Sequence, residues 1–189
     1  MIQKKALPEK HPHLAQTYNN LGYIYNAMGK PDLALKFMQN AINIWKEVLP
    51  DTHPHVLLAN DNIGYIYSAL GDHNKALEHA KQTLQIRENL FSGNHPDIAR
   101  SLNNVGFCFI AFGEYSKALE SLLKAYCIGK QRLHPNHDLM YTLCMNLAAV
   151  YNKMGRYKEE LDYQLQAISI MEKRFPQKHF SRITHYEGV

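Results

Sequence analysis

The feature that most constrains the fold is a histidine that returns every 42 residues along the chain. Its five copies are His11, His53, His95, His137 and His179. Asparagine, glycine and leucine columns keep the same spacing, at Asn20, Asn62, Asn104 and Asn146, at Gly29, Gly71, Gly113 and Gly155, and at Leu35, Leu77, Leu119 and Leu161. A fixed period of 20–50 residues indicates one supersecondary unit stacked into an array. Such an array offers a long surface to a partner instead of a single buried active site.

The period divides the chain into one continuous domain of repeated units. Complete repeats are predicted at 11–52, 53–94, 95–136 and 137–178. Residues 1–10 align with the end of a second helix, and residues 179–189 align with the start of a further repeat. We therefore expect either a segment of a longer array, or ends that associate head to tail between molecules.

Each repeat reads as two antiparallel helices. Apolar residues recur at three- and four-residue steps on both sides of Gly29, which is helical periodicity. Pro12 suits the first position of a helix, and Gly29 suits the position just after its end. The sequence predicts the N-caps of the second helices at Asp32, Asn74 and Ser116. With no strand candidate in any repeat, the predicted fold class is all-α.

Small residues recur in the middle of the first helices. Gly22, Gly64 and Gly106 occupy one column of the repeat. A mid-helix glycine costs about 1 kcal/mol relative to alanine. We therefore expect close approach of two helix backbones at these positions.

Several function classes find no support in the sequence. The net charge of +4 is spread so that no repeat exceeds +2, which argues against a nucleic-acid partner. No segment is long and apolar enough to suggest a membrane partner or an export signal. The three cysteines lack metal or CxxC spacing and suit reduced thiols, so we expect a cytoplasmic protein.

Catalysis and cofactors are also not expected. No phosphate loop, nucleophile elbow or catalytic triad pattern is present, so the segment is predicted not to be an enzyme and to need no cofactor. The His11/His13 and His53/His55 pairs invite a metal site, but no Cys or Glu lies in register with them. We assign these histidines to inter-repeat turns.

The repeat resembles a known family. Leu21-Gly22, Tyr25, Ala34 and Ala41 match the tetratricopeptide signature. The second and third repeats match it as well, at Ile63-Gly64, Tyr67 and Ala76 and at Val105-Gly106, Phe109, Ala118 and Ala125, whereas the fourth departs from it at Ala148 and Glu160. The 42-residue length and the His-Pro entry resemble the kinesin light chain type of this repeat. The resemblance implies a right-handed superhelical solenoid whose first helices line a concave groove, used for protein–protein interaction. The lysine and arginine positions with which carboxylate-clamp repeats hold a chaperone's C-terminus are not matched.

The resemblance places one asparagine per repeat in that groove, at Asn20, Asn62, Asn104 and Asn146. An asparagine amide has two donors and an acceptor, so this ladder could hold the backbone of an extended peptide. The alternative is that these asparagines satisfy groups of the neighbouring repeat, or persist from duplication. Asn19 and Asn103 lie beside the ladder in sequence and join the predicted site.

Aromatic and charged positions complete the predicted site. Tyr23, Tyr65 and Phe107 follow the asparagines by one turn and are either peptide anchors or packing residues. Arg100 and Lys153 are the expected groove cations, and Asp61 the expected groove anion. The predicted function is a scaffold that binds an extended peptide of a partner. The alternatives are a regulatory domain of a larger enzyme or signalling ATPase, and a self-assembling array.

Overall fold

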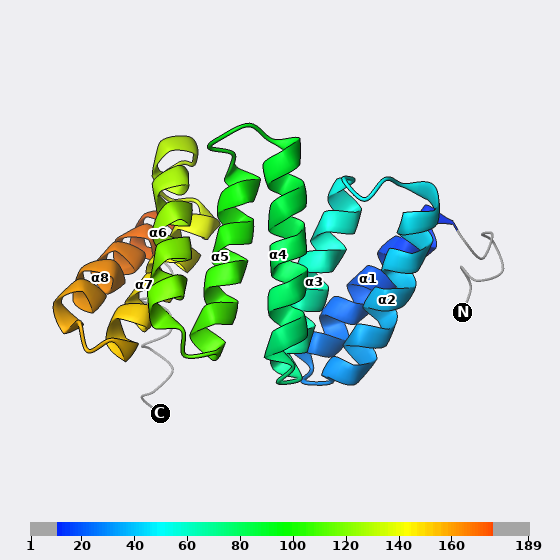
Figure 1. Ribbon diagram of the computed structural model, residues 1–189, viewed down its shortest axis with the longest axis horizontal. Helices are drawn as coiled ribbons and strands as arrows, with labels where there is room; N and C mark the ends of the chain where they lie inside the picture. Colours follow the sequence, from blue (N-terminus) through cyan, green and yellow to red (C-terminus); the bar gives the residue numbers. More distant parts are fainter. Residues whose placement is uncertain (1–10, 176–189) are drawn as a thin grey trace, which may run out of the picture. The chain divides into compact units, whose positions relative to one another are not determined.

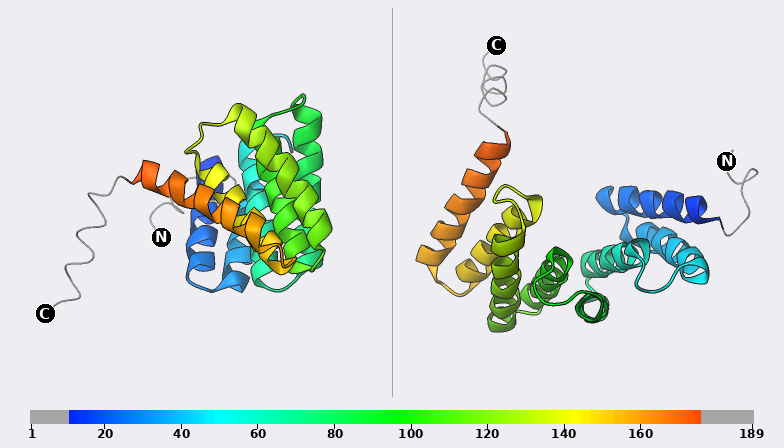
Figure 2. Two further views of the ribbon diagram at one scale, coloured as in Figure 1. Left: turned by 90° about the vertical axis from the view of Figure 1, so that its left-hand side faces the viewer. Right: turned by 90° about the horizontal axis from the view of Figure 1, so that it is seen from above.

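The computed structural model describes residues 11–175, which form eight α-helices and no β-strand. Each repeat contributes one antiparallel pair, as Figures 1 and 2 show. The helices are α1 (Pro12–Ala27), α2 (Pro31–Val48), α3 (Pro54–Ala69), α4 (His73–Leu90), α5 (Pro96–Ala111), α6 (Tyr115–Arg132), α7 (Asp138–Lys153) and α8 (Tyr157–Arg174). The predicted all-α class and the two helices per repeat are confirmed. The chain divides after Ser92 into two compact units, one holding α1–α4 and the other α5–α8.

The recurring histidine is the N-cap of every first helix. Nδ1 of His11 and of His53 each accepts a hydrogen bond from the backbone N–H two residues later, at 3.2 Å. His95 and His137 do the same at 3.1 Å. A helix start leaves backbone N–H groups without partners, and a side-chain acceptor there stabilises the helix. The 42-residue histidine column therefore has a structural explanation, which the sequence did not reveal.

The helix boundaries confirm one prediction and correct another. Gly29 follows α1 with a φ of 68°, the left-handed conformation that favours glycine, and its three equivalents behave alike. The predicted N-caps of the second helices are wrong: Asp32, Asn74 and Ser116 lie two residues inside the helices, whose N-caps are Lys30, Asp72 and Glu114. Only the Asp72 carboxylate among these three accepts a hydrogen bond from the helix, at 3.1 Å from the Lys75 N–H. A helix can start two residues before its most obvious capping side chain because water also satisfies exposed N–H groups.

Close approach of the paired helices was predicted at all three mid-helix glycines, and the structure confirms it at two of them. A Cβ at Gly22 would lie 2.8 Å from Met38 Cγ, and one at Gly106 would lie 2.7 Å from Leu122 Cγ. At Gly64 the nearest atoms would be 3.5 Å away, which is ordinary contact. The glycine is thus sterically required in the first and third repeats and not in the second.

One position of the second helix holds a different residue in every repeat. In α2 it is Trp45, 1% exposed, whose ring stacks on His55 of α3 with centroids 5.2 Å apart. The equivalent residue is Arg87 in α4, Gly129 in α6 and Met171 in α8. Trp45 thus packs against the next repeat, Arg87 pairs with Asp61 of its own repeat, and Gly129 has no side chain to place there.

Candidate functional site

The asparagine column lies on the first helices, where its members differ in environment. Asn20 of α1 is exposed and bonds only Gln16 of its own helix, at 3.0 Å. Asn62 of α3 and Asn146 of α7 are half-buried, and Asn104 of α5 is 6% exposed. The ladder therefore does not present four equally accessible amides.

Two of these asparagines bond the preceding repeat of their own unit. Asn62 Nδ2 donates to Oδ1 of Asn19 at 3.5 Å, and Asn146 Nδ2 donates to Oδ1 of Asn103 at 2.8 Å. Asn19 and Asn103 are 7% and 3% exposed, so the structure places them as buried acceptors and not on the open face. An amide that gives one N–H to a neighbour keeps a second N–H and its carbonyl oxygen. The same asparagine can therefore join two repeats and still meet a ligand.

The aromatic column lies in the open. Tyr23 is 67% exposed, Tyr65 41% and Phe107 36%, and the fourth repeat ends the column with Ala149. Leu58 and Met145 add exposed apolar surface to α3 and α7. Exposed large rings on a helix face are typical of protein-binding surfaces.

Asp61 corrects the expectation of a groove anion. Its carboxylate is buried in unit 1 and accepts a hydrogen bond from Arg87 Nη2 at 2.7 Å, with both side chains under 5% exposed. Removing two charges from water is costly unless they pair. Asp61 therefore serves the packing of α3 on α4.

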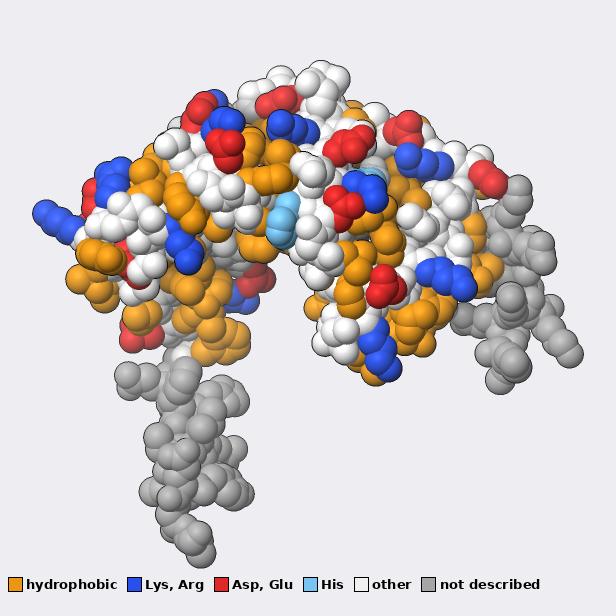
Figure 3. Space-filling model, turned by 60° about the horizontal axis from the view of Figure 1, so that its bottom comes forward, with side chains coloured by type: hydrophobic (Ala, Val, Ile, Leu, Met, Phe, Trp, Pro, Cys, Tyr) orange, Lys and Arg blue, Asp and Glu red, His pale blue; other side chains and the backbone are white. Residues whose placement is uncertain are grey.

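The remaining charges are dispersed. Arg100, a predicted groove cation, is half-exposed and pairs with Asp97 on the same helix at 3.1 Å. Lys153 is exposed in the last turn of α7. On the face drawn in Figure 3, cationic and anionic side chains alternate without forming a patch of one sign.

The histidines and cysteines have local roles. The rings of His11 and His13 stack at 5.1 Å, and within residues 11–175 no three His, Cys, Asp or Glu side chains gather as metal ligands would. Burial raises the pKa of the Cys108 and Cys144 thiols to about 11. Over the same residues, no helix is long and apolar enough to cross a membrane.

Comparison with known proteins identifies the repeat. Models of the family described as "Tetratricopeptide repeat" match residues 13–89, 57–131 and 142–181. A search of curated protein sequences gave no match.

Solved structures share the fold at low identity. Nearly identical TPR-like repeats of kinesin light chain type from Podosopora anserina are 24% identical with a TM-score of 0.68, covering 93% of this chain and 83% of that one. BtubC (BKLC) from P. vanneervenii is 22% identical with a TM-score of 0.71, over 88% of this chain and 66% of that one. A Rap protein solved in complex with Competence and Sporulation Factor is 19% identical with a TM-score of 0.72, over 84% of this chain and 43% of that one. The kinesin light chain resemblance therefore holds at the level of the fold.

Proposed function

The chain belongs to the tetratricopeptide repeat family, and from that premise we propose that it is a non-catalytic scaffold whose first helices bind an extended peptide segment of a partner protein. The observation that carries the proposal is the column of exposed aromatic rings, Tyr23 and Tyr65 in one unit and Phe107 in the other. Rings of this size are costly to leave in water and are typical anchors of protein interfaces.

Polar groups beside the rings support a peptide backbone as ligand. The asparagine column precedes each ring by one helical turn, and the amides of Asn62 and Asn146 each keep a second N–H and a carbonyl oxygen beside their inter-repeat bonds. Neighbouring helices lie 8–10 Å apart and an extended peptide advances ~3.3 Å per residue. One repeat would therefore meet about every third residue of a bound peptide.

The solved relatives add support at the level of the fold. The Rap protein, which is similar to this chain with a TM-score of 0.72, was solved in complex with Competence and Sporulation Factor. For the present chain, the partner is proposed from its own exposed rings and amides.

The test is selection of binding peptides on an array of random peptides of about ten residues, followed by affinity measurement on variants. Tyr65→Ala, and Tyr23→Ala beside it, should weaken the selected peptides by about tenfold or more, as removal of an aromatic anchor does. Tyr157→Ala is the matched control, because that tyrosine is 68% exposed but lies on a second helix. Equal affinity of all three variants would contradict the proposal.

A second candidate is head-to-tail association, favoured by the outer face of α8. Leu161, Leu165 and Ile168 are 53–55% exposed along one stripe of that helix. At the other end Ile24 of α1 is 50% exposed, whereas its counterpart Ile66 in α3 is 1% exposed. Light scattering over a hundredfold range of concentration decides this: a rising mass that Leu165→Glu abolishes supports association, and a constant monomer mass removes it.

A further inference from the structure

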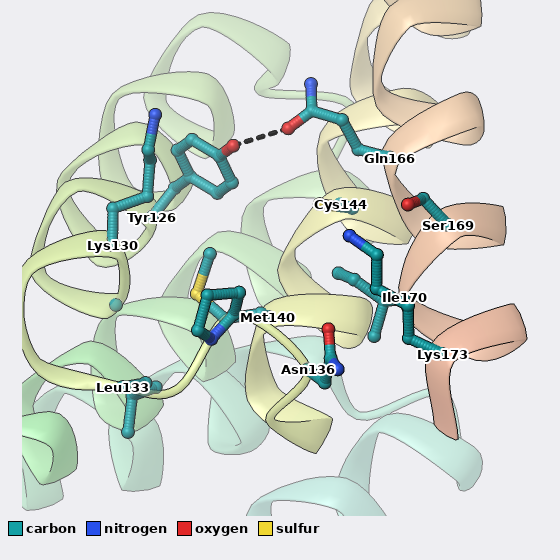
Figure 4. A pocket seen from close by; sticks show the side chains of 12 residues that line it. Tyr126, Lys130, Leu133, Asn136, Met140, Cys144, Gln166, Ser169, Ile170 and Lys173 are labelled. Carbon is teal, nitrogen blue, oxygen red and sulfur yellow. Dashed lines mark hydrogen bonds between the residues drawn. The ribbon is translucent and has the colours of Figure 1, made fainter. Parts of the chain in front are cut away.

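A pocket of about 270 Å³ lies within the second unit, away from the proposed peptide face. It is formed by the end of α6, the loop to α7, and the facing sides of α7 and α8 (Figure 4). None of the asparagine or aromatic column residues lines it. A ligand bound there would therefore be additional to the proposed peptide.

The pocket arises where the repeat has lost a large side chain. Gly129 stands at the position that Trp45 and Arg87 fill in the first two repeats, and it lines the pocket. Met140 covers part of the missing volume, since a Cβ at Gly129 would lie 2.5 Å from its Sδ. The rest stays open.

The walls combine an apolar side with hydrogen-bond donors. Met140 and Ile170 give the apolar surface, and the Tyr126 hydroxyl closes the opposite side by donating to Gln166 Oε1 at 2.5 Å. In Figure 4 the Lys173 side chain reaches toward the middle of the pocket and Ser169 lies next to it, whereas the Lys130 ammonium points outward at the rim.

The described lining of the pocket is cationic. Among its described lining residues two are lysines and none is acidic. Within residues 11–175 the Lys173 ammonium has neither an ion-pair nor a hydrogen-bond partner, although Lys130 lies 5.7 Å from the Tyr126 ring centroid. Lys173 is an exposed residue, so its ammonium stays hydrated at the mouth of the pocket and can pair with an anion there by a charge-assisted hydrogen bond.

We propose that this pocket binds a small carboxylate with a branched apolar tail, about the size of one amino-acid residue. The carboxylate would accept hydrogen bonds from Lys173 Nζ and from the Ser169 hydroxyl, and the tail would lie against Met140 and Ile170. The volume equals that of about nine waters at ~30 Å³ each, which fits a ligand of this size. The same chemistry is offered by a free short-chain carboxylate and by the C-terminal leucine of a peptide.

The full chain with ¹³C-labelled methionine methyl groups tests the proposal by NMR titration. We expect 4-methylpentanoate to shift the Met140 signal with millimolar affinity and to leave Met38, buried in the first unit, unchanged. The neutral analogue 4-methylpentan-1-ol should bind about tenfold more weakly, since it lacks the charge. Equal binding of the acid and the alcohol, or shifts that do not include Met140, would overturn the proposal.

Variants drawn from the repeat itself separate binding from folding. Lys173→Gln installs the residue that the preceding repeat carries as Gln131, and it should weaken 4-methylpentanoate about tenfold. Ser169→Phe should block the pocket, whereas Cys127→Phe, at the equivalent exposed position of α6, should not. Lys158→Gln controls for charge elsewhere on α8. Unchanged affinity in both Lys173→Gln and Ser169→Phe overturns the site.

Two further probes distinguish the sources of the ligand. N-acetyl-leucine binding at least as tightly as 4-methylpentanoate, with N-acetyl-leucinamide failing to bind, assigns the pocket to a peptide C-terminus. Rejection of N-acetyl-leucine while 4-methylpentanoate binds assigns it to a free carboxylate.

Discussion

Replacing single asparagines of the ladder separates its two roles. Asn146 gives its amide N–H to Asn103 at 2.8 Å, and Asn103 is 3% exposed. Asn146→Ala therefore leaves a buried carbonyl oxygen without this donor, which costs ~1–3 kcal/mol. Asn20→Ala removes only an exposed bond within its own helix, and alanine is the better helix former by about 0.5 kcal/mol.

The two variants should differ clearly in stability. A loss of ~1–3 kcal/mol corresponds to a fall in Tm of about 2–12 °C for a chain of this size. Asn146→Ala should show that fall in a circular dichroism melt, whereas Asn20→Ala should stay within about 2 °C of the parent. Asn62→Ala should lie between them, because its bond to Asn19 is longer, at 3.5 Å.

Peptide affinity measured on the same variants completes the experiment. If the ladder holds a peptide, Asn20→Ala should lose about 2–10-fold in affinity, the equivalent of one net hydrogen bond of ~0.5–1.5 kcal/mol. Unchanged affinity in a fully folded Asn20→Ala protein would refute the ladder. An Asn146→Ala protein as stable as the parent would refute the inter-repeat role of the Asn146–Asn103 bond.

Substitutions at two buried contacts and alkylation of the cysteines give three further tests of the packing. Gly22→Ala should destabilise the chain by about 1–3 kcal/mol because the new methyl would collide with α2. Gly64→Ala, at the equivalent position of α3, should be neutral or stabilising by up to about 1 kcal/mol. Chemical denaturation compares the two variants, and equal effects would contradict the contact. Asp61→Ala should cost about 3–5 kcal/mol because it removes the carboxylate that pairs with the buried Arg87 guanidinium. Asp61→Asn with Arg87→Met should recover most of that loss, so a double variant as unstable as the single one would contradict the reasoning. Burial raises the pKa of the Cys108 thiol from an ordinary 9.0 to about 11, so its contribution to stability is complete below pH 9 and is lost as the pH rises toward 11. Alkylation at pH 8 should therefore label the exposed Cys127 well before Cys108. Equal rates of labelling would contradict this expectation.

Periodicity predicted the regular part of this molecule. The helix pairs and the glycine that ends each first helix depend on residues that act locally. Each repeat therefore predicts its own two helices and the turn between them. The N-caps of the second helices did not follow, because several early positions can start a helix and only the backbone shows which one does. The sequence correctly placed His11 in a turn between repeats. It did not predict that the His11 side chain accepts a hydrogen bond from the first turn of the helix.

The contacts that differ between repeats depend on pairs of repeat positions that lie on different helices. Comparing one repeat position at a time does not show which positions pair. The column of Asn19 holds Asp61 in the repeat whose second helix carries Arg87, and the two charges are buried against each other. The prediction of Asp61 as a groove anion was wrong because it considered Asp61 alone, whereas its partner Arg87 is 26 residues away on another helix. The role of the position that holds Trp45 likewise depends on the residues around it. Trp45 stacks on His55 of the next helix, whereas Gly129 at the same position lines a pocket beside Met140. Asp61 and Arg87 differ together from the other repeats and are buried against each other, whereas Gly129 removes a side chain that Met140 only partly replaces and lines a pocket in its repeat.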